Sequence, residues 1–186
     1  LGNHDYGAGM GETEILDRIL LLREADLRPG SYNVSVMGTG DVDTGYADTV
    51  VRELEMDGVR VLRNEAVTVD LGGKNLTIVG LDDCWAGRTR PPAMPDTGAF
   101  TIYLIHEPEC RAAWEADLIL AGHTHGGQFV AGIPQALDAA GALDLSGLKM
   151  RGGVPTYITR GVGTSNFNPE LRFLVPPEIV AINPSG

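Results

Sequence analysis

Two short apolar runs limit the possible folds more than any other feature of this chain. Thr101–Ile105 and Leu118–Ala121 are almost continuously apolar, as expected of strands that are covered on both faces of a sheet. The segment between them, Pro108–Ala116, is predicted to be a connecting helix, which completes a strand–helix–strand unit. Because strand-like and helix-like segments alternate along the rest of the chain, the sequence predicts an α/β class in one domain, residues 1–186.

Periodicity and turn residues predict the other elements. Apolar residues recur at helical spacing over Glu12–Ala25 and Tyr46–Met56, and Gly58 is expected to stop the second helix. Asp83–Gly98 and Gln128–Gly153 are predicted to be surface loops. Further strands are expected at Val59–Leu62, Val67–Leu71, Leu76–Leu81, Val154–Thr159, Leu171–Val175 and Ile179–Ile182. Gly72-Gly73 should join the second and third of these strands into a hairpin.

Composition excludes several classes of protein. Hydrophobic residues make up 43% of the chain and charged residues 21%, which is typical of a globular domain. The net charge of −11 repels nucleic acid at long range, so no nucleic-acid partner is expected. A phosphorylated substrate remains possible, because bound divalent cations would reverse the sign of the charge locally. Cys84 and Cys110 lack CxxC spacing; a buried structural role is favoured for both, and a disulfide stays open.

All four histidines lie in three short segments, Gly2–Asp5, Ile105–Pro108 and Gly122–Gly127. Imidazole is the commonest neutral nitrogen ligand of transition metals and the usual acid or base near neutral pH. His123 and His125 stand at i and i+2 just past a buried strand, and on an extended segment they would project to the same side. Open α/β sheets bind ligands at this edge, so metal binding is favoured over loop histidines that only bond to their neighbours.

The other two segments add further donors. His106 ends the run that begins at Thr101, so adjacent strands that each end in histidine would converge on one point. The Asn3 carbonyl is a hard oxygen ligand, and Asp5 beside His4 can orient the imidazole and raise its basicity. The alternative for residues 2–5 is an ordinary turn, and the alternative for His106 is a residue at a helix N-terminus without a ligand role.

Together, Gly2-Asn3-His4-Asp5, His106 at a strand end and Gly122-His123-Thr124-His125 resemble the last three sequence blocks of the calcineurin-like metallophosphoesterase family. Thr159–Ser165 and Pro176–Ile179 are similar to its bacterial, often membrane-associated phosphodiesterase branch. The resemblance implies an α/β/β/α sandwich, a pair of sheets between helices with metals where strands end. It also implies hydrolysis of a phosphodiester or pyrophosphate bond by a metal-bound hydroxide.

The resemblance assigns roles to individual residues. Asn3, His106 and His123 would hold one divalent ion and His125 would reach a second, each ion being Mn, Fe or Zn. His4, held by Asp5, would protonate the leaving-group oxygen. Arg160 would contact phosphate, or else be a solvated or helix-facing arginine without that role.

The family opens with Asp-x-His and Gly-Asp-x-x-Asp, and neither motif precedes Gly2. Gly40–Asp43 resembles the second motif but follows residues 2–5, so we interpret it as a loop. The chain is therefore expected to be a carboxy-terminal part of the catalytic domain, a sandwich incomplete on its amino-terminal side, with weak or absent catalysis of its own. The branch further implies a phosphorylated small-molecule or lipid-linked substrate and a bacterial protein that is cytoplasmic or reaches a membrane through a preceding segment.

Two other classes compete with this interpretation. One is a non-catalytic metal-binding or interaction module that retains only the late motifs. The other is a metallo-β-lactamase-like hydrolase, which also uses His-x-His. In that hydrolase the pattern continues with Asp-His, whereas here Gly126-Gly127 follows His125, so it is set aside.

Overall fold

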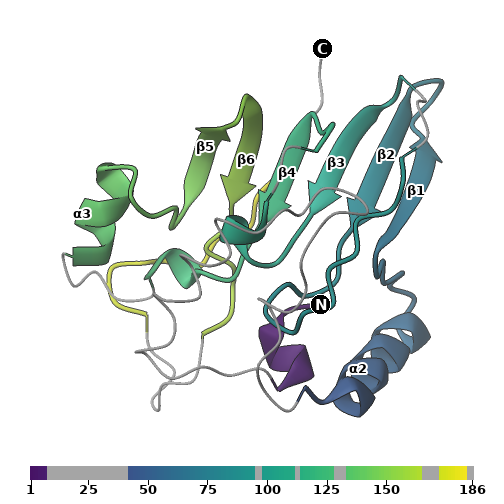
Figure 1. Ribbon diagram of the computed structural model, residues 1–186, viewed down its shortest axis with the longest axis horizontal. Helices are drawn as coiled ribbons and strands as arrows, with labels where there is room; N and C mark the ends of the chain where they lie inside the picture. Colours follow the sequence, from purple (N-terminus) through teal and green to yellow (C-terminus); the bar gives the residue numbers. More distant parts are fainter. Residues whose placement is uncertain (8–41, 95–97, 112–113, 128–132, 165–171, 184–186) are drawn as a thin grey trace.

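The computed structural model describes residues 1–7, 42–94, 98–111, 114–127, 133–164 and 172–183. They form one six-stranded mixed sheet in the order β1-β2-β3-β4-β6-β5, with helical segments at one end of the strands and beside it (Figure 1). The α/β class is therefore confirmed. The strands are β1 Glu65–Asp70, β2 Asn75–Gly80, β3 Phe100–Leu104, β4 Leu118–Ala121, β5 Gly147–Arg151 and β6 Val154–Ile158. The helices are α2 Thr44–Met56 and α3 Ile133–Ala139, with short 3-10 turns η1 Asn3–Tyr6, η3 Pro108–Cys110 and η4 His125–Gly127.

The four central strands are parallel, and this decides where side chains can gather. β2, β3, β4 and β6 pair in parallel, while β1 and β5 add antiparallel edges. The carboxyl ends of the central strands therefore meet at one edge of the sheet. Two residues beyond these four strands lie Asp82, His106, His123 and Arg160, in that order.

The predicted hairpin and second helix are confirmed. β1 and β2 pair from Glu65↔Gly80 to Asp70↔Asn75, and Gly72 and Gly73 turn the chain with φ of 72° and 91°. α2 begins after Asp43, whose carboxylate accepts a hydrogen bond from the Tyr46 N–H at 2.8 Å. Asp43 thus caps a helix. Of the predicted Gly40–Asp43 loop, the structure describes only Val42 and Asp43.

The connecting helix predicted over Pro108–Ala116 is wrong. Among the described residues of this segment only the 3-10 turn η3 is helical, because Arg111 adopts extended backbone angles (φ −69°, ψ 147°) directly after it. The Arg111 guanidinium reaches back to the Pro108 carbonyl at 2.7 Å and pairs with Asp144. Cys110 is bonded covalently to Cys84, so the chain leaves the turn at a point set by another loop.

Several other predictions need correction. Val59–Leu62 pairs with no strand among the described residues; it crosses closely over the end of β2 instead. Leu171–Val175 is not a strand in its described part, since Leu174 has a φ of +59°. Ile179–Ile182 is also outside the sheet. The predicted Gln128–Gly153 loop contains α3 and β5, and the helix predicted over Glu12–Ala25 lies outside the described residues.

The core lies on one face of the sheet. Val79, Tyr103 and Ile119 point from three neighbouring strands into a cluster closed by Trp85 and Trp114. The Tyr103 and Trp114 rings stack with their centroids 4.8 Å apart and their planes 8° from parallel, a contact worth about 0.5–1.5 kcal/mol beyond the area it buries. The opposite face is more open, since Phe100, Leu148 and Met150 remain exposed.

The two cysteines form a disulfide, the outcome that the sequence left open. Cys84 follows β2 and Cys110 ends η3, and both are buried. The bond joins the loop that carries Trp85 to the turn that follows His106. Closing a loop of this size typically stabilises a domain by about 2–4 kcal/mol.

Gly80, at the end of β2, leaves room for Leu62. A Cβ added at Gly80 would lie 2.3 Å from the Leu62 Cβ and 2.8 Å from its carbonyl oxygen. We therefore expect Gly80→Ala to destabilise the fold by about 1–3 kcal/mol, because backbone must move to admit the methyl group. Urea unfolding would measure the loss. Gly45→Ala is the matched control, since its nearest neighbour lies at an ordinary 3.4 Å, and an equal loss there would contradict the packing argument.

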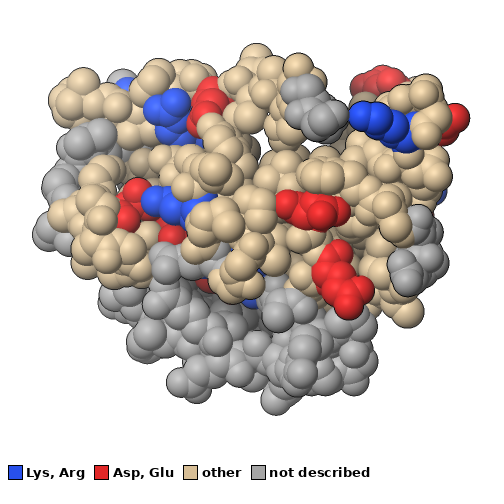
Figure 2. Space-filling model, turned by 90° about the horizontal axis from the view of Figure 1, so that it is seen from above, with Lys and Arg blue, Asp and Glu red and all other residues tan. Residues whose placement is uncertain are grey.

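On the face shown in Figure 2, charged side chains are scattered among uncharged residues, some as neighbours of opposite sign and some as acidic groups alone. Within the described part of the chain, no helix has the length and apolar character needed to cross a bilayer.

Candidate metal centre

His106 and His123 lie close together at the end of the sheet, as their positions at the ends of two apolar strands predicted. The pairing of β3 with β4 continues past the strands, with the Ile105 N–H bonded to the Leu120 carbonyl at 2.9 Å and the Gly122 N–H to the His106 carbonyl at 3.0 Å. This extension brings the His106 and His123 rings to a centroid separation of 5.0 Å at an angle of 81°.

Asn3 joins this pair from the amino-terminal turn. Its side-chain oxygen lies 3.1 Å from the His106 Nε2, and its side chain is buried. Two ligand atoms that bind one ion at about 2.1 Å and at right angles would be about 3 Å apart, so this spacing suits a shared metal. Gly2 permits the approach, because a Cβ there would lie 2.6–2.9 Å from three atoms of the His106 ring.

The turn that carries Asn3 is anchored at both ends. The Asp5 N–H donates to the Gly2 carbonyl at 3.0 Å, and the Gly2 N–H donates to the Asp5 carboxylate at 2.8 Å. At the other end, the buried Tyr6 hydroxyl donates to Asp82 at 2.6 Å and packs beside Ala47 of α2. Burial, and then Asp82, raise the pKa of Tyr6, so its hydroxyl remains a donor at all ordinary pH values. Arg63 bridges Asp82 to Asp48 of α2.

The backbone of the two histidines of Gly122–Gly127 differs from the one predicted. His123 and His125 do not lie on an extended segment; both adopt the left-handed conformation, with φ of 66° and 50°. This backbone costs about 1–2 kcal/mol for each non-glycine residue and persists only where the surroundings enforce it. The Trp85 ring meets the His123 ring edge-on at 4.3 Å and fixes its position.

His125 is held from the other side. The Arg172 guanidinium donates through Nη2 to its Nδ1 at 3.5 Å. Arg172 also donates to the His125 carbonyl at 3.4 Å.

The surroundings keep the imidazoles neutral. Burial lowers the pKa of His106 to about 4 and that of His123 to about 3. Burial and then the Arg172 charge also lower the pKa of His125. His4 contributes repulsion to all three, which places its exposed ring within electrostatic range of the others. Neutral rings at pH 7 are ready to bind a cation.

A pair of buried carboxyl groups lies directly behind the histidines. Asp83 and Glu107 are both almost inaccessible and hydrogen-bond to each other. Asp83 also accepts from the Ala86 N–H at 2.5 Å, and Glu107 from the Cys84 N–H at 3.2 Å. Burial raises the pKa of both, and the Asp83 charge raises that of Glu107 further. One proton shared between them therefore satisfies two oxygens that find no other partner in the described structure.

These donors fit a single transition-metal ion. One oxygen of Glu107 and one ring nitrogen each of His106 and His123 lie within 4.8 Å of one another, and the Asn3 oxygen adjoins His106. Neutral imidazoles with amide or carboxylate oxygen suit Mn, Fe and Zn alike. For a second ion, His125 is the predicted ligand.

The remaining predicted site residues lie close by with other contacts. The bond from Asp5 to Gly2 closes its own turn, so the role of Asp5 in holding His4 stays a prediction. Arg160 pairs through Nε with Glu178 at 2.9 Å. Its stem packs against Gly126, where an added Cβ would lie 2.7 Å from the Arg160 Cγ. Contact between Arg160 and phosphate also stays a prediction.

The motifs in the sequence assign no role to Trp85, Glu107 or Arg172. Glu107 follows a predicted ligand directly and could have been suspected from that position alone. Arg172 has no such signal, because the sequence predicts it to lie in a strand far along the chain from the histidines. Only the fold brings it to His125.

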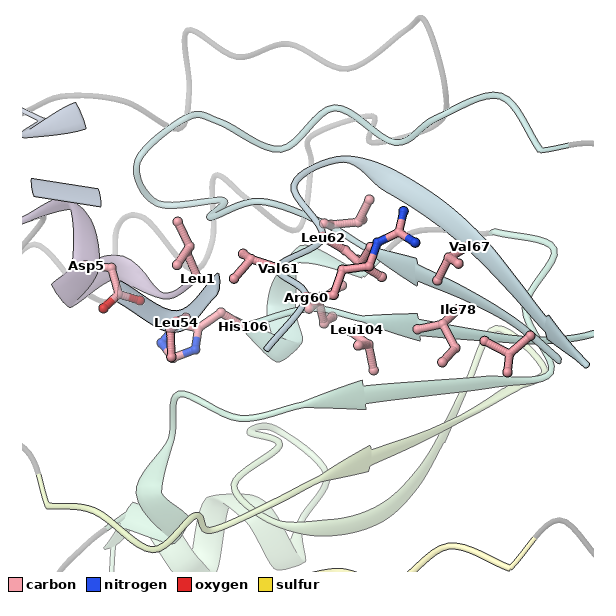
Figure 3. Close-up of a pocket in the computed structure, with 14 residues that line it drawn as sticks. Leu1, Asp5, Leu54, Arg60, Val61, Leu62, Val67, Ile78, Leu104 and His106 are labelled. Atoms are coloured by element: carbon pink, nitrogen blue, oxygen red, sulfur yellow. The ribbon is translucent and has the colours of Figure 1, made fainter. Parts of the chain in front are cut away.

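A cavity of about 680 Å³ opens beside the centre. Asp5, Leu1 and His106 lie at one end, and apolar side chains such as Val67 and Ile78 line the other (Figure 3). The segment that carries Val61 and Leu62 forms one wall. The cavity is thus mainly apolar; the Asp5 carboxylate and the His106 imidazole lie at one end, and Arg60 lies between the two ends.

Curated proteins with similar sequences carry phosphoesterase names. Phosphodiesterase YaeI of Escherichia coli (strain K12) is 33% identical over 132 residues, covering 65% of this chain and 48% of the relative. An uncharacterized metallophosphoesterase of Aquifex aeolicus (strain VF5) is 30% identical over 173 residues, covering 87% and 64%. The uncharacterized metallophosphoesterase YkuE of Bacillus subtilis (strain 168) is 32% identical over 148 residues, covering 73% and 50%.

The chain spans between 48% and 64% of the length of these three relatives. No family model and no solved structure matches it.

Proposed function

The chain belongs to the calcineurin-like metallophosphoesterase family, and from that premise we propose that the protein is a metal-dependent phosphoesterase that cleaves a phosphodiester or pyrophosphate bond. The observation that carries the proposal is the convergence of Asn3, His106 and His123 from three distant segments, with the Asn3 oxygen 3.1 Å from the His106 Nε2. Two neutral imidazoles and an amide oxygen form a donor set that suits a transition-metal ion.

Different residues of the site are assigned metal binding and proton donation. Asn3, His106 and His123 would hold one ion and His125 a second. When bound, the two ions would supply an activated water and neutralise negative charge on the phosphoryl oxygens. The exposed ring of His4 would donate a proton to the leaving-group oxygen.

The cavity supports a substrate with an apolar portion. It begins at Asp5 and His106 and continues between apolar side chains, so a phosphoryl group at the histidines would direct its substituent there. We propose a phosphorylated small molecule or lipid-linked diester as substrate. The net charge of −11 makes a nucleic acid the less favoured partner.

Removal of the metal is expected to abolish activity. The protein encoded by the complete reading frame should hydrolyse a bis-aryl phosphodiester with Mn²⁺, lose at least about 100-fold of its rate on treatment with a chelator, and regain it when Mn²⁺ is restored. Release of the aryl alcohol measures the rate. The 186-residue chain assayed in parallel is expected to be weak or inactive.

Two results would separate the alternatives. Hydrolysis that persists after the metal has been removed would contradict the proposal. Tight Mn²⁺ binding without hydrolysis of any diester or pyrophosphate would favour the non-catalytic metal-binding module.

A further inference from the structure

We propose that Tyr6 is a positioning residue for Asn3, the predicted metal ligand. Its hydroxyl, held between Asp82 and Arg63, ties the turn η1 to the edge of the sheet that carries His106. Asn3 is thereby kept at ligating distance from the His106 ring. The contacts stand by themselves, while the metal ion that they would serve rests on the proposed function. No motif in the sequence assigns this role to Tyr6.

Two charged partners hold the Tyr6 hydroxyl. It donates to the Asp82 Oδ1 at 2.6 Å and accepts from the Arg63 Nη2 at 2.6 Å. Because the Arg63 Nε also donates to the Asp82 Oδ2, at 2.9 Å, the three side chains close a ring of hydrogen bonds. Hydrogen bonds to charged groups are stronger than those between neutral groups, and the Tyr6 side chain is buried away from competing water. The hydroxyl is therefore fixed in place.

Asp82 and His106 belong to the same end of the sheet. Each lies two residues beyond one of the paired parallel strands β2 and β3. The pairing continues past β2, because the Leu81 N–H donates to the Leu104 carbonyl at 3.0 Å. A hydrogen bond from Tyr6 to Asp82 therefore fixes η1 to the strands from which His106 projects.

The turn η1 is short enough to transmit this restraint to Asn3. It is a single turn that begins at Asn3 and ends at Tyr6, and it lies beside α2 at the carboxyl ends of the strands (Figure 1). The Gly7 N–H closes the turn on the His4 carbonyl at 3.1 Å. Metal ligands must lie within about 0.2 Å of their ideal distances, so a small shift of η1 is enough to weaken the site.

Tyr6→Phe removes the hydroxyl and leaves the buried ring and the ion pair between Arg63 and Asp82 in place. Its first readout needs no metal: nuclear Overhauser cross-peaks between the Gly2 α-hydrogens and the His106 ring, recorded on the chelator-treated protein encoded by the complete reading frame. Gly2 caps η1, and a Cβ there would lie 2.6–2.9 Å from three atoms of that ring, so the wild type should show strong cross-peaks. They should weaken in Tyr6→Phe, because η1 is released from Asp82.

The second readout is Mn²⁺ affinity in a double-mutant cycle. Tyr6→Phe should weaken Mn²⁺ binding by about 10-fold in the wild-type background. In an Asn3→Ala background the same substitution should change the affinity by less than about 2-fold, because the ligand that Tyr6 positions is already gone. A role limited to general stability would cost the same factor in both backgrounds.

Tyr157→Phe is the matched control. The Tyr157 hydroxyl also donates to a carboxylate that pairs with an arginine, in this case Glu178 and Arg160, and none of the three is a predicted metal ligand. This variant should keep the wild-type cross-peaks and Mn²⁺ affinity. Arg63→Lys is a second test variant that should change both readouts as Tyr6→Phe does, because an ammonium cannot hold a hydroxyl and a carboxylate in one fixed fork.

Wild-type cross-peaks in a folded Tyr6→Phe protein would overturn the proposal. So would unchanged Mn²⁺ affinity in Tyr6→Phe beside a weakened Asn3→Ala, an equal loss in both Asn3 backgrounds, or an equal change in Tyr157→Phe. An Asn3→Ala protein that binds Mn²⁺ as tightly as the wild type, or a wild type that binds none, would instead contradict the proposed function. The metal-free cross-peaks would still decide the role of Tyr6.

Discussion

Replacing His123 with alanine is expected to remove the metal from the protein and its phosphoesterase activity with it. His123 is one of three donors that converge at the end of the sheet, and its ring is held between Trp85 and His106. Removal of a ligand should weaken binding by more than the roughly 10–100-fold that loss of an outer partner costs. Metal content after gel filtration, measured with the rate on a bis-aryl phosphodiester, gives both effects.

His4→Ala is the matched comparison, because His4 is an exposed member of the same cluster to which we assign proton donation and not ligation. It should keep the wild-type metal content and lose turnover. His123→Gln retains the volume beside Trp85 and separates loss of a ligand from loss of packing. Wild-type metal content in both His123 variants would remove this residue from the ligand set.

Asp83→Asn is expected to stabilise the fold at alkaline pH by about 1–3 kcal/mol. The asparagine amide would donate to the Glu107 oxygen that now depends on a shared proton, and its carbonyl would still accept from the Ala86 N–H. In the wild type both folded-state pKa values are raised, chiefly by burial, so the free energy of unfolding falls as pH rises through them. The variant keeps only the part of this loss that burial of Glu107 causes.

Urea unfolding of both proteins from pH 5 to pH 9 measures the difference. It should be largest at pH 9 and shrink toward pH 5, where the wild-type pair holds its proton. Asp57→Asn, at an exposed position, should show no such trend. A difference that is independent of pH would contradict a shared proton between Asp83 and Glu107.

Local patterns in the sequence predicted the elements that local forces stabilise. The hairpin turn needed only two glycines, and α2 needed only a capping aspartate and helical spacing. The helix after Pro108 was mispredicted because a disulfide and the extended Arg111 end it after one turn. Val59–Leu62 looked like a strand because it is apolar, yet its side chains pack over Gly80 without joining the sheet.

Some features of the candidate site could likewise be predicted from the sequence, and others could not. Histidines at strand ends could be placed from the sequence, because parallel strands deliver their ends to one edge. The left-handed turn at His123 could not, since the spacing that suggested an extended segment fits a tight turn equally well. Glu107 and Arg172 act through contacts with residues distant in sequence, and only the fold reveals such partners.

Selecting variants for thermal stability alone would favour loss of the histidines at positions 123 and 125. Glycine adopts the backbone of positions 123 and 125 without penalty, so substitutions there could raise the melting temperature while they erase the imidazoles. Directed evolution of a more thermostable variant should therefore include a screen for retained cation binding in every round.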